Sequence, residues 1–291
     1  MTRLLTLTTI LLAGFTAVAM ASDRSAAGKG AEWLLRADPD ASGTAADAVV
    51  ALRAGGHLSG SQASARAAQL RSDAPGYATT AGATAKTILG LVATGSGNPR
   101  CAGNIDLLNR LVARGSKGRY GKTAWDQSLG MIALKALRRT PPASTARFLL
   151  AARGKGGWNF TLSKSGRDDV THTALAIMGL RAAGVKPSER GLRDGVKWLI
   201  KQRTPSGGFA HQRRDRNEAN ATALAVQALR SVGRTDRRGL AALRALQRGD
   251  GAFQFTASDS GSRQLATVDA VVALSGRYLP AATVKRAPQR C

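Results

Sequence analysis

GVKWLIKQRTPSGGFAHQRRDRNEANATALAVQAL, residues Gly195–Leu229, is the stretch of which the other segments of the chain are variations. It begins with a short apolar helix pattern around Trp198, which breaks at Pro205 and the glycine pair that follows. An aromatic residue, a polar loop and a second, alanine-rich helix pattern complete it. The apolar faces of one such helix–turn–helix unit cannot be buried by the unit alone, so we expect several units to pack side by side.

The eight-residue frame that ends this stretch, TALAVQAL, has six copies in the chain. The terminal leucines of the copies lie 39, 43, 46, 49 and 45 residues apart. Recurrence at this spacing is typical of a repeat architecture. The copies are AADAVVAL, TAKTILGL, QSLGMIAL, TALAIMGL, TALAVQAL and TVDAVVAL, ending at Leu52, Leu91, Leu134, Leu180, Leu229 and Leu274.

A turn of glycine followed by an aromatic residue precedes each of the last five frames. Glycine at such a position favours a left-handed helix cap, and the aromatic side chain can fill the gap between neighbouring helix pairs. The turns are Gly76–Tyr77, Gly118–Tyr120, Gly156–Trp158, Gly207–Phe209 and Gly251–Phe253.

The two helices of each unit differ in composition. The frame helices are rich in small residues, which let helix backbones approach closely and therefore suit an inner ring. The preceding helices carry more arginine, lysine and bulky residues, which suit an outer ring in contact with water. We therefore predict an all-α fold, an (α/α)6 barrel of six helix hairpins; an open superhelix is the alternative.

The N-terminus has the pattern of an export signal. Arg3 precedes an apolar run from Leu4 to Ala19, and Ala19-Met20-Ala21 fits an A-x-A cleavage site. We expect a signal peptide over residues 1–21, a repeat domain over 22–279, a C-terminal tail over 280–291 and a secreted, extracytoplasmic protein. The alternative is a permanent membrane anchor, for which the run is short; no span is expected in the mature chain.

Cys101 and Cys291 are the two cysteines of the chain. In an exported protein an isolated pair is expected to form a disulfide, which here would tie the last residue to the loop before the third repeat. Free or intermolecular thiols are the alternative.

The composition is strongly basic. Lys and Arg number 43 against 18 Asp and Glu, which gives a formal net charge of +25. This balance favours anionic partners such as polymers of the cell envelope. The arginines are scattered over every segment and aromatic residues make up 4% of the chain, so nucleic-acid binding is not expected.

WLIKQRTPSGGF (Trp198–Phe209), followed by TALAVQAL, resembles the repeat of the prenyltransferase and squalene-cyclase superfamily, to which the terpene cyclases belong. The resemblance runs from about Trp33 to Leu274. It implies an α/α toroid whose central cavity is open at one end. It does not imply one reaction, because the superfamily includes cyclases, prenyltransferase subunits and, more distantly, vitamin B12 carriers.

The catalytic motifs that this resemblance leads us to look for are incomplete. Similar cyclases carry Asp-x-Asp-Asp before an inner helix, where this chain has Asp169-Val170-Thr171-His172 and lacks the protonating acid. Similar prenyltransferases bind zinc through Asp-x-Cys and a later histidine. The matching residues are Asp126, Ser128 and His172, so the thiolate is missing. The catalytic candidates are Asp126, Asp169 and His172; no cofactor is expected, with zinc at Asp126 and His172 as the alternative.

Aromatic and acidic residues beside the frames are the candidates for ligand binding. A cluster of aromatic residues at the rim would form an apolar mouth, whereas the same residues in the core would need no ligand. Acidic residues at the starts of inner helices are equally explained by the helix dipole. The candidates are Tyr120, Trp125, Trp158, Phe160, Phe209, Glu218, Phe253 and Asp269.

Together these features predict a secreted, non-catalytic protein that binds an apolar, isoprenoid-like or cofactor-like small molecule in the barrel mouth. Anionic cell-envelope polymers are a second class of partner. The alternatives are a divergent terpene-cyclase-like, prenyltransferase-like or glycan-active enzyme and a protein–protein scaffold. An enzyme would bring Asp126, Asp169 and His172 into one open pocket, and a scaffold would have a filled interior.

Overall fold

A computed structural model describes residues 2–95, 98–212 and 216–283, with the backbone alone for residues 2–19. Within these ranges the chain folds into helices joined by turns and isolated β-bridges. The frame helices are α2 (Ser42–Gly55), α4 (Ala81–Thr94), α6 (Ala124–Ala136), α8 (Val170–Ala182), α10 (Ala219–Ser231) and α12 (Arg263–Leu274). The helices that alternate with them are α1 (Thr2–Ala37), α3 (Gly60–Tyr77), α5 (Leu107–Ala113), α7 (Ala143–Ala151), α9 (Arg190–Lys201) and α11 (Arg237–Arg244).

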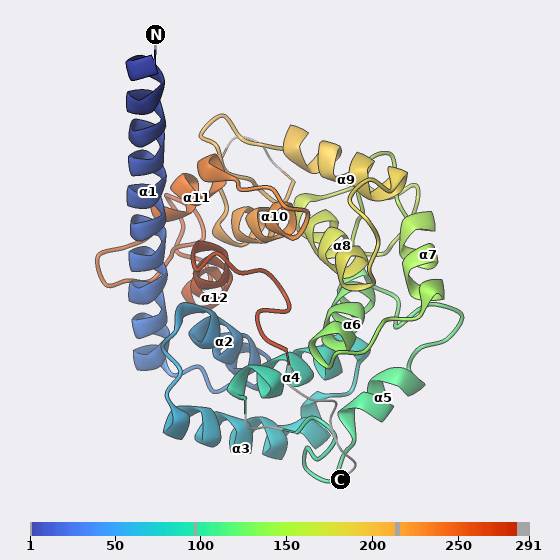
Figure 1. Cartoon of the computed structure of the whole chain (residues 1–291). Coiled ribbons are helices and arrows are strands. Elements are labelled where there is room, and N and C mark those ends of the chain that lie inside the picture. Colours follow the sequence, from blue (N-terminus) through green and yellow to red (C-terminus); the bar gives the residue numbers. More distant parts are fainter. Residues whose placement is uncertain (1, 96–97, 213–215, 284–291) are drawn as a thin grey trace.

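The six frame helices form a closed inner ring. Each packs against the next, and α12 packs against α2, so that the last frame meets the first (Figure 1). The odd-numbered helices lie around this ring as an outer layer (Figure 1). The structure therefore confirms the predicted α/α toroid of six hairpins, and it excludes the open superhelix.

Side-chain size separates the two layers as the composition predicts. In the outer helix α9, Leu192, Val196 and Leu199 are buried at helical spacing, while Arg193 and Lys197 are exposed. The inner helices bury residues on nearly all sides, because neighbours flank them within the ring and outer helices cover them. Such helices need small residues at their contacts.

A hydrogen bond ties four of the glycine–aromatic turns to the frame that follows. The backbone N–H of the aromatic residue donates to the side chain of the first frame residue, at 2.9 Å to threonine in three repeats and at 3.0 Å to glutamine in a fourth. The aromatic side chains are 0–4% exposed, as predicted for residues that fill gaps between hairpins. The pairs are Trp158–Thr173, Phe209–Thr222, Phe253–Thr267 and Tyr120–Gln127.

The predicted turn at Gly76–Tyr77 is wrong. Both residues belong to the last turn of α3, and three residues connect α3 to α4, which leaves no room for a glycine–aromatic turn. The first frame residue of this repeat, Thr84, instead donates to the carbonyl oxygens of Ala78 and Thr80, at 3.1 and 2.7 Å.

Helix α1 joins the ring through its C-terminal half. The first buried side chain of the described part is Asp23, which is ion-paired with Arg244 of α11, and Ala27 and Ala31 are buried further along the helix. The N-terminal half extends beyond the ring (Figure 1), and the helix runs without a break through the predicted cleavage site. Among the side chains described, no helix presents an apolar stretch long enough for a bilayer.

The segment after α12 returns across the ring. Leu279, Ala281 and Ala282 pack against the hydrophobic core from this segment. Cys291 lies outside the described residues, so its pairing with Cys101 stays a prediction.

Gly90 of α4 offers a test of the inner-ring packing. A Cβ atom there would lie 3.0 Å from Cα of Ala46 in α2 and 2.8 Å from Cδ1 of Leu70. Gly90→Ala should therefore lower the free energy of unfolding by about 1–3 kcal/mol, although alanine ordinarily favours a helix. At Gly76 of α3 a Cβ would meet nothing within 4 Å, so Gly76→Ala should be neutral or stabilise by up to about 1 kcal/mol. Urea unfolding of both variants measures the difference, and equal effects would contradict the close contact of α2 with α4.

Candidate functional site

A cavity of about 530 Å³ lies inside the inner ring. Thr80 and Leu265, which is 42% exposed, mark its mouth near the N-terminal ends of the inner helices. Leu279 of the C-terminal segment contributes to its lining. The interior is thus hollow, unlike the filled interior expected of a scaffold. Most of the wall is apolar and is formed by Val50, Leu89, Leu129, Leu175, Leu224, Val268 and Val272.

Polar side chains gather on one side of this cavity, which we call the seam cluster: Asp47, Lys86, Asn220 and Asp269. Lys86 Nζ lies 2.5 Å from Asp47 Oδ2, and Asn220 Nδ2 donates to Asp269 Oδ2 at 2.7 Å. These residues come from α2, α4, α10 and α12, the two repeats on either side of the ring closure. The cluster therefore exists only because the first and last parts of the chain meet.

Burial sets the protonation of the seam cluster. It raises the pKa of Asp269 to about 7, where the hydrogen bond from Asn220 opposes the shift and the Asp47 carboxylate adds to it. Burial likewise raises the pKa of Asp47, against the attraction of Lys86. Burial alone would lower the pKa of Lys86, but the neighbouring Asp47 carboxylate outweighs it and the pKa is raised. Near neutral pH, Asp269 can therefore either donate or accept a hydrogen bond.

Lys86 and Asn220 were not predicted from the sequence, and Asp47 was recognised only as one of the acidic residues at the starts of inner helices. Asp47, Lys86 and Asp269 all occupy the third position of their frames, AAD, TAK and TVD, where the other three frames have leucine. All six third-position side chains line the cavity. A polar residue at the third frame position was therefore the signal that could have located the cluster.

Asp126 also lines the cavity, but hydrogen bonds hold its carboxylate in the wall. Oδ1 accepts from the N–H of Gly82 in the first turn of α4, and Oδ2 accepts from Thr123 Oγ1, each at 2.8 Å. Ser128 is fully buried where α6 packs against Gly179 of α8, and its Oγ has no hydrogen-bond partner among the described residues. These contacts account for Asp126 and Ser128 without a metal ion, and zinc at Asp126 and His172 stays the untested alternative.

Asp169 and His172 belong to a different site. Asp169 caps α8, and its Oδ1 accepts from the backbone N–H of His172 at 2.9 Å and lies 2.8 Å from Nδ1 of the same residue. His211, from the loop before α10, places Nδ1 3.3 Å from Asp169 Oδ1. None of these three residues lines the central cavity. The candidates Asp126, Asp169 and His172 therefore do not share one pocket, contrary to the condition for the enzyme alternative.

The ligand-binding candidates divide into three groups. Trp125 and Asp269 line the cavity. Phe160, 49% exposed, contacts the ring of His172 at a centroid distance of 5.4 Å, and Glu218 accepts a hydrogen bond from the backbone N–H of His211 at 2.8 Å. The remaining four are core residues and do not form the apolar mouth that the sequence suggested, because the gaps between hairpins enclose them: Tyr120, Trp158, Phe209 and Phe253.

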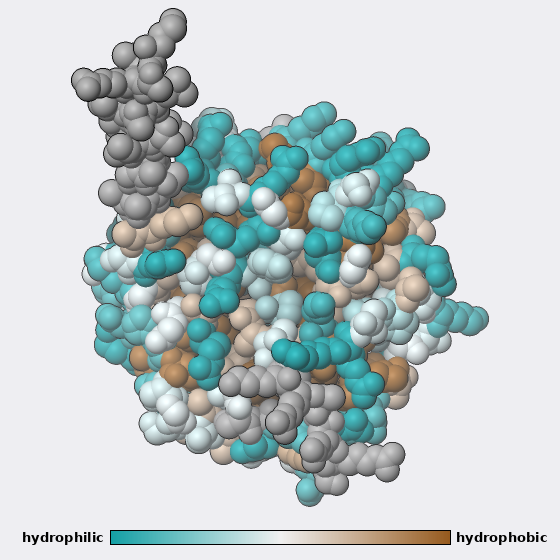
Figure 2. Space-filling model, viewed as in Figure 1, coloured by the Kyte–Doolittle hydropathy of each residue, from teal (hydrophilic) through white to brown (hydrophobic). Residues whose placement is uncertain are grey.

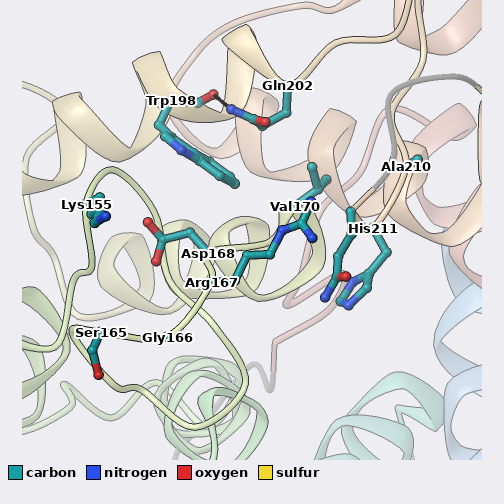
Figure 3. Close-up of a pocket in the computed structure, with 11 residues that line it drawn as sticks. Lys155, Ser165, Gly166, Arg167, Asp168, Val170, Trp198, Gln202, Ala210 and His211 are labelled. Carbon is teal, nitrogen blue, oxygen red and sulfur yellow. Dashed lines mark hydrogen bonds between the residues drawn. The ribbon is translucent and has the colours of Figure 1, made fainter.

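A second pocket of about 480 Å³ opens on the outside of the ring between α9 and the loop before α8. Figure 3 shows Lys155, Asp168, Arg167 and His211 around it, with Trp198 of α9 above. Its lining is more polar than that of the central cavity, and two of its side chains are cationic. It therefore suits a polar or anionic group better than an apolar molecule.

The pKa of Asp269 has a consequence for stability. The folded protein keeps this proton up to about pH 7, whereas the unfolded chain releases it near the ordinary value of 3.8. The contribution of Asp269 therefore lowers stability progressively between about pH 4 and pH 7 and is constant above. Asp269→Asn preserves an acceptor for Asn220 and does not titrate, so its stability relative to wild type should rise across that interval, by on the order of a few kcal/mol.

Urea unfolding of both proteins from pH 4 to pH 8 measures this rise. Asp250→Asn is the control, because a hydrogen bond from Arg263 lowers the pKa of the exposed Asp250 and no such rise should follow. A flat difference for Asp269→Asn, or the same rise in both variants, would show that Asp269 titrates normally.

The comparisons with known proteins concern the fold. No family model and no curated protein matches the chain. Among solved structures it is similar to a type II terpene cyclase variant from Scytonema in complex with its substrate, geranylgeranyl dihydroxybenzoate. The TM-score is 0.63 at 15% identity, over 88% of this chain and 97% of the cyclase. This chain therefore has the α/α-toroid fold of that type II terpene cyclase.

Proposed function

We propose that this chain is an exported, non-catalytic protein that binds an amphipathic small molecule, isoprenoid-like in its apolar part, in the central cavity. The observation that carries the proposal is the pairing of an apolar wall with one polar cluster at the seam. Small-molecule sites combine a largely apolar lining with a few placed polar groups, in cavities of about 300–1,000 Å³. The apolar wall would hold the hydrocarbon part, and the seam cluster would hold a polar group.

The similar cyclase supports the choice of ligand class by analogy. Its substrate joins a geranylgeranyl chain to a dihydroxybenzoate group, an apolar body with a polar end. A ligand of this type would match the division of the cavity into an apolar wall and the seam cluster. The chemistry of the wall supports the analogy, since Leu175 and Leu224 line the same cavity as the seam cluster.

The non-catalytic part of the proposal rests on the failure of both familiar motifs. His172 and Thr171 stand where the cyclase motif needs acids, and Ser128 is buried away from the cavity. A second candidate is an enzyme in which Asp269 protonates a bound substrate. It is favoured by one observation, the carboxyl group with a pKa of about 7 facing an apolar cavity, since such a group can act as a general acid.

Export and envelope contact belong to the same proposal. The first buried side chain described, Asp23, comes two residues after Ala21, so cleavage there would leave the described packing of the ring intact. Hydrophilic residues are spread over the face shown in Figure 2, and the chain carries a net charge of +25. A surface of this kind would favour contact with anionic cell-envelope polymers.

Ligand binding can be tested by the thermal unfolding midpoint, which a ligand of the folded state must raise. Geranylgeraniol should raise the midpoint of the wild type. Ala83→Phe, which places a ring in the cavity from α4, should weaken binding at least about tenfold. Ala68→Phe on the exposed side of α3 is the matched control and should bind as the wild type does.

Three outcomes would decide between the alternatives. A midpoint raised by cyanocobalamin and not by geranylgeraniol would replace the isoprenoid-like ligand with a cofactor-like one. A new product in mass spectra after incubation with geranylgeraniol, lost in Asp269→Asn, would establish the enzyme. No shift with either compound would contradict ligand binding in the cavity.

A further inference from the structure

We propose that Asp169, His172 and His211 bind a divalent transition-metal ion, with Zn²⁺ as the probe. We call these three residues the rim cluster. The proposal is independent of the ligand in the central cavity, because none of the three side chains lines it. It also differs from the zinc set implied by the sequence, since Asp126 and Ser128 take no part.

The donor atoms of the rim cluster are already close together. One possible ligand atom from each residue lies within 4.8 Å of the other two. Asp169 Oδ1 is 2.8 Å from His172 Nδ1 and 3.3 Å from His211 Nδ1. A tetrahedral zinc ion with bonds of about 2.0–2.2 Å separates its ligand atoms by roughly 3.3–3.6 Å, so small side-chain movements would suffice.

Hydrogen bonds of the backbone hold the start of α8 and the loop that carries His211 in fixed positions relative to each other. The N–H of Val170, the first residue of α8, donates to the carbonyl oxygen of His211 at 3.1 Å. The N–H of His211 donates to Glu218 Oε2 at 2.8 Å. Ring contacts from Phe160 and Trp125, at centroid distances of 5.4 and 6.2 Å, fix the imidazole of His172. Metal sites depend on this kind of support for their ligands.

The charge of the rim cluster favours a bound cation. The Asp169 side chain is 4% exposed, and its charge partners among the described residues are the two histidines, without a lysine or arginine. A divalent ion would neutralise this carboxylate without a proton on either imidazole.

The donor set points to a class of metal. Two imidazoles and one carboxylate suit zinc and its transition-metal neighbours, whereas magnesium and calcium prefer oxygen ligands. Three protein ligands leave a fourth position open. His211 is 41% exposed in its side chain and borders the outer pocket of Figure 3, so an ion could enter from there. Arg167 and Lys155 of that pocket would favour an anionic fourth ligand.

Calorimetric titration of Zn²⁺ into untagged, chelator-treated protein tests the proposal. The chain has three histidines, and the third, His57, lies near Glu32 of α1 and outside the rim cluster. We expect one Zn²⁺ per chain for the wild type and for His57→Gln. His211→Gln should bind Zn²⁺ at least about 100-fold more weakly. His211 carries the test because it is partly exposed, whereas substitution of the buried His172 would also disturb the start of α8.

Circular dichroism of His211→Gln establishes that the variant is folded. Co²⁺ provides a second readout, because its visible spectrum reports four-coordinate binding and should be lost in the same variant. The proposal is overturned if the wild type binds no Zn²⁺ at one equivalent, if folded His211→Gln binds as tightly as the wild type, or if His57→Gln abolishes binding. None of these results depends on whether the central cavity binds a ligand.

Discussion

The hydrogen bond between the turn amide and the first frame residue fixes the last four of the six hairpins of the ring. In three repeats a buried threonine accepts from the aromatic residue's N–H, and in two of them, at Thr173 and Thr222, the same hydroxyl donates to that residue's carbonyl oxygen. Leaving such buried groups unpaired would be costly, so each turn is held at a fixed place beside its inner helix. The aromatic ring is thereby directed into the gap between hairpins, and successive hairpins stack in the same way.

This regular stacking decides what faces the cavity. The third position of every frame points inward, and the two acids and the lysine found there all belong to frames beside the closure of the ring. Asp47 is ion-paired with Lys86, and burial raises the pKa of Asp269 to about 7, so that this carboxyl group can retain its proton near neutral pH. A ligand would therefore meet a nearly neutral but strongly hydrogen-bonding group at one side of an apolar chamber.

Most of the fold could be predicted from the sequence because the frames repeat, and small residues marked the inner ring. The site was harder to predict. An aromatic residue after a glycine has the same sequence pattern whether its side chain is buried in the core or lines a cavity mouth. Tertiary packing buries the four aromatic side chains of the turns, Tyr120, Trp158, Phe209 and Phe253. The approach of His211 to Asp169 could not be predicted, because it joins loops of two repeats and no spacing within either loop indicates it. Asp47 and Lys86 could have been found, had the third frame position been compared across the repeats.

The contact between the two ends of the ring also has a consequence for how the protein folds. The ion pair of Asp23 with Arg244 and the hydrogen bond from Gln247 to the carbonyl oxygen of Ala26 each join positions 221 residues apart. Contacts of such long range form late, because the entropy of closing the chain must first be overcome. Before they form, the arc of hairpins has two free apolar edges, on α2 and on α12, that are exposed to aggregation. The final step of folding removes both edges and, in the same movement, assembles the seam cluster.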